Sequence, residues 1–351
     1  MLYGLYIQLL THCNMKKFII ENHIPYIKGL LEPFAQVEYL PNEAITPEAV
    51  ADADALIVRT RTRCNSDLLS GSRCSFIASA TIGTDHIDLD YCHRQGITVC
   101  NAPGCNAPAV AQYVIATIGH LLESKGYAAE VMTLGVVGVG HVGSIVARWA
   151  KETGLKVILN DPPRQRDESN FEGVSLDKVA SDADIVTFHT PLTRTGADAT
   201  YHLCDNSFIN SLKKCKLLIN SARGEITDNK ALLSGLESRK IGEVAIDCWE
   251  NEPRISNELL DKAFVATPHI AGYSIEGKQR ATAMVLEAVK RHFGFDMAIP
   301  TINAPAKGAA DVTIAKVMES YNPLDDTSRL KENPCAFEQL RNNYDLRHEV
   351  R

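Results

Sequence analysis

The feature that most limits how this chain folds is a repeated order of short apolar runs and longer helix-like segments. The runs are rich in β-branched residues, and most are stopped by Gly, Asn, Asp or Thr. Runs of this kind suit parallel strands that are buried on both faces, with helical crossovers between them. The sequence therefore predicts an α/β fold with the strands KKFII, ALIVRT, SFIASA, ITVC, TLGVVGV, KVILND, DIVTFHT, KLLINS and EVAIDC.

The composition argues against nucleic acid and membranes as binding partners. The 351 residues carry a formal net charge of −7. A general nucleic-acid binder usually presents a basic face, so here an anionic ligand has to be held by local arginines or backbone amides. No apolar run approaches the roughly 20 residues that span a bilayer, and the apolar N-terminus makes a poor signal peptide. We expect a cytoplasmic protein that binds neither nucleic acid nor membrane.

A glycine-rich loop, GVVGVGHVG, follows one predicted strand and precedes a predicted helix. In such a loop Gly138 permits a tight turn, Gly140 lets amides approach a pyrophosphate, and Gly143 lets helix and strand pack closely. The next strand ends at Asp161, whose carboxylate can bind ribose hydroxyls and would repel a 2′-phosphate. An ordinary glycine turn is the alternative, and the nearby Arg164 weakens the preference for NAD over NADP. We predict an NAD site whose loop residues are Gly138, Gly140, His141, Val142 and Gly143.

Polar side chains follow three later strands, where ligands bind in parallel sheets. They are Arg223 after KLLIN, Asp247 and Glu252 after EVAI, and His269 after AFVAT. Arginine can clamp a carboxylate, histidine can take a hydroxyl proton near neutral pH, and glutamate can orient the imidazole. Taken singly, they also suit a surface ion pair, a helix-terminal charge and a capped loop residue. Together they predict hydride transfer to or from a hydroxy acid.

Longer segments of the chain are shared with a known family. They are TIGTDHIDLDYC, NAPGCN, GVVGVGHVG, FHTPL, NSARGEITDNKALL, DCWENEP and TPHIAGYS. Together they resemble the D-isomer-specific 2-hydroxyacid dehydrogenase family, from about Met15 to the C-terminus. The resemblance implies a catalytic trio with His269 as the acid/base, namely Arg223, Glu252 and His269. It implies NAD contacts from Asp161, Thr190, Asp247 and Gly272, and substrate contacts from Thr60, Thr81, Tyr273 and the backbone amides of Ile82 and Gly83.

The same resemblance implies the order of the domains. A substrate-binding domain (15–107 and 272–293) is interrupted by an NAD-binding Rossmann domain (108–271), with helices near 108–125 and 274–293 crossing the hinge. A small C-terminal α+β module (294–351) is expected to mediate homodimerisation, and residues 1–14 to be an N-terminal extension. The expected architecture is thus two doubly wound parallel-sheet domains, Rossmann-like and flavodoxin-like, plus this module.

Arginines in two places suit a phosphorylated substrate. VRTRTR carries Arg59, Arg61 and Arg63, of which Arg59 is the better phosphate ligand because it ends a predicted strand beside Thr60. For Arg61 and Arg63 a solvated strand end is an equal alternative. Arg347, in the charged tail NNYDLRHE, is a second phosphate ligand if the tail folds back onto the site.

Two other functions remain open from the sequence. A 3-phosphoglycerate or glycerate dehydrogenase would use the same trio, and an NAD-sensing corepressor or scaffold can retain it without turnover. No metal is expected, because the histidines show no H-E-x-x-H pairing. We therefore expect an NAD-dependent enzyme acting on a phosphorylated 2-hydroxy acid.

Overall fold

The computed structural model describes residues 15–301 and 312–350 of the chain. The predicted extension, residues 1–14, lies outside the described residues. The described chain divides into two compact units: unit 1 comprises residues 15–106 and 276–301, and unit 2 comprises residues 107–275 and 312–350. No helix in the described ranges is long and apolar enough to cross a membrane.

Unit 1 is built on a parallel sheet in the order β2-β1-β3-β4-β5, which is a flavodoxin-like order. Its strands are β1 (Lys17–Glu21), β2 (Gln36–Leu40), β3 (Ala55–Val58), β4 (Phe76–Ser79) and β5 (Thr98–Cys100). Its helices are η1 (Asn42–Ala44), α2 (Pro47–Val50), α3 (Ser66–Leu69), α4 (Leu89–Arg94) and α12 (Ile275–Phe293), which begins at the boundary with unit 2.

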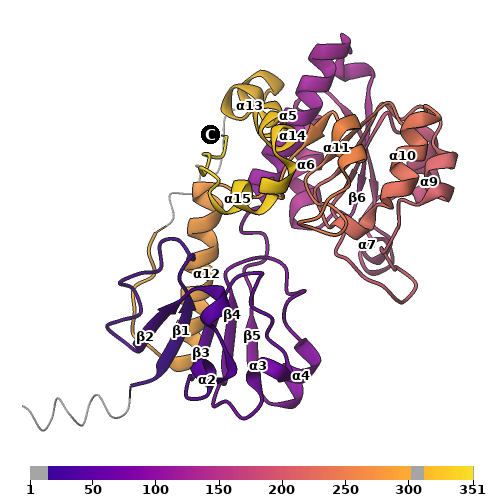
Figure 1. Cartoon of the computed structure of the whole chain (residues 1–351). Coiled ribbons are helices and arrows are strands. Elements are labelled where there is room, and N and C mark those ends of the chain that lie inside the picture. Colours follow the sequence, from indigo (N-terminus) through magenta and orange to yellow (C-terminus); the bar gives the residue numbers. More distant parts are fainter. Residues whose placement is uncertain (1–14, 302–311, 351) are drawn as a thin grey trace, which may run out of the picture. The chain divides into compact units, whose positions relative to one another are not determined.

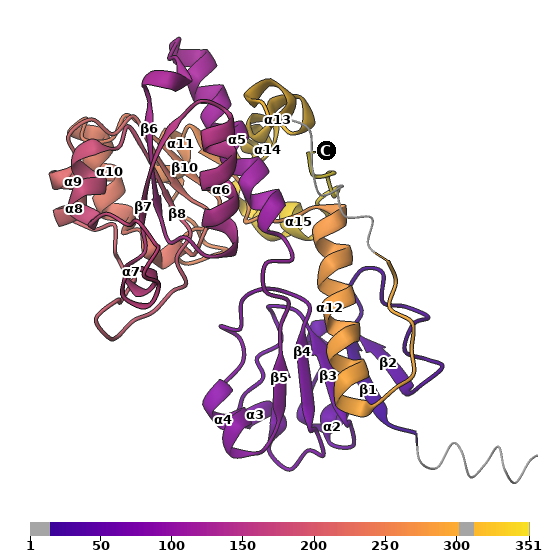
Figure 2. The same cartoon turned by 180° about the vertical axis from the view of Figure 1, so that it is seen from behind.

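Alternate residues of each strand in unit 1 enter two apolar cores. Phe18 and Ile57 pack with α12 on one face of the sheet, and Figure 2 shows this helix lying along the strands. Ile19 and Leu56 pack on the other face with the apolar residues of α2, α3 and α4. Burial on both faces explains why these strands read as continuous apolar runs. The sequence-based prediction missed β2, an edge strand whose side chains are largely exposed or half-buried.

Unit 2 is built on a second parallel sheet, in the order β11-β10-β9-β8-β6-β7. Its strands are β6 (Thr133–Val137), β7 (Lys156–Asn160), β8 (Ile185–Phe188), β9 (Leu217–Asn220), β10 (Glu243–Ile246) and β11 (Val265–Ala266). The helices before and between them are α5 (Ala107–Lys125), η2 (Ala129–Val131), α6 (His141–Glu152), α7 (Pro162–Asp167), α8 (Leu176–Asp182), α9 (Asn206–Ser211), η3 (Gly224–Ile226), α10 (Asn229–Glu237) and α11 (Asn257–Lys262).

Helices cover both faces of this second sheet (Figure 1). Helices α5 and α6 pack on one face, against strand residues such as Leu134 and Ile219. Helices α8, α9, α10 and α11 pack on the other, against residues such as Val186 and Leu218. The chain order reverses between β6 and β8, and in open parallel sheets the crevice at such a reversal is where ligands bind.

The C-terminal residues 312–350 belong to unit 2 and do not form a unit of their own. They contain α13 (Ile314–Ser320), α14 (Pro323–Glu332), η4 (Pro334–Ala336) and α15 (Phe337–Asn342). Instead of the predicted α+β module, this part of the chain is helical, apart from an isolated bridge between Ser274 and Arg347. Val317, Leu330 and Phe337 are fully buried in the cores of unit 2, which explains why the segment stays attached to it.

Candidate active site

The glycine loop has the geometry that dinucleotide binding requires. Gly138 follows β6 with a positive φ of 86°, and Gly140 caps α6 without any side chain to accept its first N–H groups. A Cβ on Gly143 would collide with the carbonyl oxygen of Gly138, so only glycine fits where α6 crosses β6. His141 and Val142 form the first turn of α6, whose amides are available to an anion.

A buried hydroxyl lies beside this turn. A Cβ on Gly138 would come within 2.8 Å of Thr190, which places the side chain of Thr190 against the loop. Its Oγ1 is buried and has no hydrogen-bond partner among the described residues. Because buried hydroxyls normally have a partner, this one fits a ligand that supplies it. The glycine turn and Thr190 together fit NAD.

Asp161 lies at the end of β7, next to the same loop. One carboxylate oxygen accepts the N–H of Val139 at 2.8 Å, and the other caps α7 by accepting the N–H of Arg164 at 3.1 Å. The guanidinium of Arg164 is held by Glu168 at 2.6 Å and by the carbonyl of Val139 at 2.7 Å. Arg164 is thus neutralised within the loop, which removes the main sequence-based argument for NADP.

Replacing Asp161 with alanine is expected to weaken NAD binding roughly tenfold to a hundredfold, because a charged group loses its hydrogen bonds to the ribose. The helix cap is lost too, at about 1 kcal/mol of stability. Titration of each coenzyme into the purified variant measures the first effect. NADP binding as tight as that of NAD in the variant would contradict selection by charge.

Glu252 and His269 form the centre of the predicted catalytic group. Nδ1 of His269 lies 2.9 Å from Oε2 and 3.1 Å from Oε1 of Glu252. Oε1 also accepts the N–H of Trp249 at 2.8 Å, which fixes the carboxylate. With Nδ1 held in this way, Nε2 is the ring nitrogen that can exchange a proton with a substrate.

The charges around His269 favour the protonated ring. Burial opposes the positive charge, but the interactions with Cys248 and Glu252 outweigh burial and hold the pKa of His269 well above its usual 6.5. Burial raises the pKa of the Cys248 thiol, so the thiol is neutral near pH 7 and Glu252 supplies the negative charge. Burial also opposes ionisation of Glu252, yet His269 leaves the pKa of Glu252 below its usual value.

Asp247 holds the loop that carries His269. His269 has a positive φ of 58°, a backbone conformation that costs a non-glycine residue about 1–3 kcal/mol. Oδ1 of Asp247 accepts the N–H groups of Ile270 at 2.7 Å and Ala271 at 3.0 Å and the hydroxyl of Thr267 at 2.7 Å. This clamp was not foreseen from the sequence, which assigned Asp247 to NAD. Gly272 follows the same loop, and both NAD contacts stay predictions.

Arg223 follows β9, on the same edge of the sheet. Its carbonyl accepts a hydrogen bond from Asn220 at 2.9 Å, and its guanidinium donates to the carbonyl of Ala222 at 2.8 Å. A Cβ on the next residue, Gly224, would collide with the carbonyl of Trp249, so this segment packs directly against the segment that leads to Glu252. The three predicted catalytic residues therefore come from neighbouring strand ends.

Arg347 is not available for a phosphate, which corrects the sequence-based prediction. Its guanidinium donates to the carbonyls of Ile270, Tyr273, Ala109 and Ala271, to Gln112 and to the hydroxyl of Tyr344. It also stacks 4.0 Å from the ring of Tyr321. Because an arginine has five N–H groups, these contacts use its donors entirely. Arg347 ties the C-terminal segment to the loop behind His269.

Replacing Arg347 with glutamine is expected to destabilise unit 2 by about 3 kcal/mol, because several carbonyls lose their donor. Urea unfolding measures this loss. The matched control is Arg329→Gln, which removes an exposed arginine of α14. This arginine pairs with Asp326 at 3.6 Å, and its loss should change stability by less than about 1 kcal/mol. Unchanged stability of the Arg347 variant, with a raised KM for a phosphorylated acid, would restore the original prediction.

The C-terminal segment does reach the predicted catalytic residues, but through Arg341 and not through Arg347. Nε of Arg341, near the end of α15, donates to the hydroxyl of Tyr273 at 3.3 Å, and Nη1 lies 3.8 Å from Oε2 of Glu252. The side chain of Arg341 is only 14% exposed. Sequence reasoning named Tyr273 but missed Arg341, although Arg341 directly precedes the motif NNYDLRHE that contains Arg347.

The remaining predicted substrate residues belong to unit 1. Arg59 and Thr60 follow β3, and the guanidinium of Arg59 lies 3.8 Å from Glu21. In the loop after β4, the hydroxyl of Thr81 is 2.7 Å from that of Ser79, and Asn101 donates to the carbonyl of Ile82 at 2.6 Å.

The side chain of Asn101 fixes this loop by binding the backbone carbonyl of Ile82. The backbone N–H groups of the loop therefore remain available to other partners. Within the described chain, the N–H groups of Ile82 and Gly83 donate to no other group. Free amides of this kind suit the predicted carboxylate contact.

Cys248, Glu252 and His269 also offer ligand atoms that all lie within 4.8 Å of one another. A thiolate, a carboxylate and an imidazole are a set that zinc can use. The guanidinium of Arg341, 3.8 Å from Glu252, opposes a second positive charge there. We assign no metal to the reaction.

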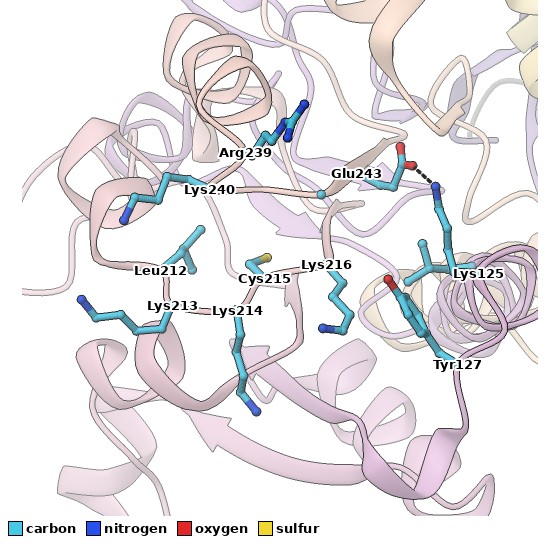
Figure 3. Close-up of a pocket in the computed structure, with 12 residues that line it drawn as sticks. Lys125, Tyr127, Leu212, Lys213, Lys214, Cys215, Lys216, Arg239, Lys240 and Glu243 are labelled. Carbon is cyan, nitrogen blue, oxygen red and sulfur yellow. Dashed lines mark hydrogen bonds and ion pairs between the residues drawn. The ribbon is translucent and has the colours of Figure 1, made fainter.

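A hollow of about 410 Å³ lies elsewhere on unit 2, at the amino ends of β9 and β10 (Figure 3). It is lined largely by basic side chains, but Lys125 is paired with Glu243 at 2.7 Å, and Lys214 with Asp184 at 2.9 Å. The lysines drawn in Figure 3 point in different directions and do not converge on one point. The catalytic group lies at the carboxyl ends of these strands, so this hollow is not the active site.

Comparison with known proteins gives results that agree with this geometry. The model of the D-isomer specific 2-hydroxyacid dehydrogenase NAD binding domain matches residues 119–271. The erythronate-4-phosphate dehydrogenase of Bacteroides thetaiotaomicron is 45% identical over 338 residues, which cover 95% of this chain and 97% of that protein. The protein of the same name from Porphyromonas gingivalis is 38% identical, with 93% and 92% covered.

Solved structures share the fold. The D-lactate dehydrogenase of Aquifex aeolicus, complexed with NAD and lactic acid, matches with a TM-score of 0.67 and 24% identity, covering 80% of this chain and 96% of that one. The NAD-dependent formate dehydrogenase of Staphylococcus aureus, in complex with NAD, matches with a TM-score of 0.62 and 23% identity, covering 80% and 96%. The prediction of two parallel-sheet α/β domains is confirmed.

Proposed function

The chain belongs to the erythronate-4-phosphate dehydrogenases, within the D-isomer specific 2-hydroxyacid dehydrogenases, and on that premise we propose how its residues divide the reaction. It is an NAD-dependent oxidoreductase that oxidises 4-phospho-D-erythronate to 3-hydroxy-2-oxo-4-phosphooxybutanoate. We place this step in the biosynthesis of pyridoxal 5′-phosphate. The observation that carries the proposal is the 2.9 Å contact between His269 and Glu252, on the sheet that also bears the glycine loop.

His269 acts as the acid/base. In the oxidation, Nε2 takes the proton of the C2 hydroxyl, and the ring becomes an imidazolium. Glu252, held by the N–H of Trp249, stabilises that charge through Nδ1. Because the pKa of His269 is raised, the ring has to lose its proton before it can serve as a base, so oxidation is favoured at higher pH. The reverse reduction uses the protonated ring.

Binding of the substrate carboxylate is assigned to Arg223 and to the backbone amides of Ile82 and Gly83. A guanidinium can bind a carboxylate with two parallel hydrogen bonds, and free amides add donors without an additional side chain. Thr60, Thr81 and Tyr273 are assigned to the hydroxyl groups of the substrate. Arg59 keeps its assignment to the phosphate.

NAD supplies the acceptor for the C2 hydride when it is bound. The residues that would hold it are the glycine loop, with its free amides at the start of α6, and Thr190 with its unpartnered hydroxyl. Asp161 would accept hydrogen bonds from the ribose. Asp247 and Gly272 complete the assignment, beside the loop that carries His269.

A steady-state assay tests the function directly. The purified chain is supplied with NAD and either 4-phosphoerythronate or 3-phosphoglycerate, with an oxidant system that removes NADH. We expect kcat/KM to be higher for 4-phosphoerythronate. Preference for 3-phosphoglycerate would indicate the related dehydrogenase, and turnover of neither, with NAD-dependent binding of a protein partner, would indicate a scaffold.

Two further parts of the proposal rest on the sequence alone. They are a homodimer formed through residues 294–351 and a place in the cytoplasm. Sedimentation equilibrium of the full chain tests the first, since a monomer at micromolar concentration would contradict it. Fractionation of cells that express the full chain tests the second.

A further inference from the structure

The buried guanidinium of Arg341 has more hydrogen-bonding capacity than the protein uses. Within the described chain, its contacts are one hydrogen bond to Tyr273 at 3.3 Å and the 3.8 Å approach to Glu252. Most of its five N–H groups therefore have no partner in the described part of the chain. This contrasts with Arg347, six residues away, whose donors are all used.

The charge of Arg341 is also poorly compensated. Glu252 is the carboxylate with which Arg341 forms an ion pair, and it already binds Nδ1 of His269 at 2.9 Å and the N–H of Trp249 at 2.8 Å. With His269 protonated, two positive charges share one negative charge. A desolvated guanidinium that lacks a counter-charge is costly, so the site is built for an additional anion.

The fold holds Arg341 firmly in this position. α15 begins at Phe337, which is fully buried, and Leu340 packs against the same core. The ring of Tyr273 packs edge-on against Tyr344 at 6.1 Å, just beyond the end of the helix. The guanidinium therefore projects from a rigid support to the side of His269 where Tyr273 lies.

We propose that Arg341 binds the phosphate group of the substrate. This inference rests on the proposed function, in which Arg223 binds the carboxylate and leaves the phosphate, two carbons beyond the reacting C2, without a ligand from unit 2. A phosphate dianion accepts several N–H groups at once, as a guanidinium fork requires. The C-terminal segment thus adds selectivity for a phosphorylated acid to a general hydroxy-acid site.

Kinetics with paired substrates test the proposal. For Arg341→Gln we expect kcat/KM with 4-phosphoerythronate to fall roughly tenfold to a hundredfold, mainly through KM. With unphosphorylated erythronate kcat/KM should stay within about twofold, because the lost contact is absent there. Arg341→Lys should lie between the two, because it keeps the charge and loses the fork. Arg329→Gln, on α14 of the same segment, should match the wild type.

Inorganic phosphate provides a second readout. It should inhibit the wild type in competition with 4-phosphoerythronate, and its inhibition constant should rise in Arg341→Gln in step with KM. Thermal unfolding and NAD titration confirm that the variant is folded. An equal loss with both acids, or an unchanged inhibition constant, would overturn the proposal and make Arg341 a positioning residue for Glu252. A wild type that oxidises neither acid would instead refute the proposed function.

Discussion

Replacing His269 with glutamine is expected to lower kcat by about 10²–10⁴-fold, the usual contribution of a positioned general base. Glutamine keeps a similar size and can still bond to Glu252, but it cannot accept the proton of the C2 hydroxyl. NAD affinity should be nearly unchanged, because no coenzyme contact is assigned to the side chain of His269. Steady-state rates with 4-phosphoerythronate and direct titration of NAD separate the two effects.

The chain offers a matched control for this variant. His202 forms a second histidine–glutamate pair in unit 2, with Nε2 at 2.7 Å from Oε1 of Glu250. That pair does not lie on the loop after β11, and no substrate or coenzyme contact is assigned to it. His202→Gln should retain kcat within about twofold. Equal losses in both variants would mean that His269 supports the structure and does not transfer the proton.

The central strands of both sheets were predictable because they are buried on two faces and read as unbroken apolar runs. The edge strands β5 and β7 are mostly half-buried but still carry apolar runs, whereas the edge strand β2, QVEYL, places polar residues between its apolar ones. The C-terminal segment could not be placed from its charged composition. It joins unit 2 through a few apolar residues, such as Leu330 and Phe337, and spacing alone does not say which core they enter.

The site was predictable where the chemistry of a residue determines its role. Glu252 and His269 lie together as expected, because strand ends of a parallel sheet share one edge. The two tail arginines were not distinguishable, since their roles depend on whether backbone carbonyls reach the guanidinium. Arg347 meets several, while Arg341 meets none within the ranges that the structure describes. The clamp of Asp247 on the His269 loop likewise depends on backbone N–H groups that sequence does not position.

Replacing Glu252 with glutamine is expected to reduce kcat for oxidation by up to about 10⁴-fold, the loss seen when the carboxylate behind a catalytic histidine is removed. The imidazolium that forms during the reaction loses its counter-charge. The same change lowers the pKa of His269, because Glu252 helps to raise it. The neutral ring then exists at lower pH, so the rise of the oxidation rate with pH should move to lower pH while the plateau falls. For the reduction, the fall in rate with increasing pH should move in the same direction.

A double variant shows whether Glu252 acts through the imidazole of His269 or has a separate role in the reaction. If Glu252 works only by orienting His269 and stabilising its charge, adding Glu252→Gln to His269→Gln should cost no further activity. Glu250→Gln, which alters the His202 pair, should leave the pH profile of oxidation in place. Additive losses in the double variant, or a pH profile that Glu252→Gln does not shift, would mean that the carboxylate contacts the substrate itself. The 2.9 Å contact with Nδ1 and the fixed geometry imposed by Trp249 favour action through the ring.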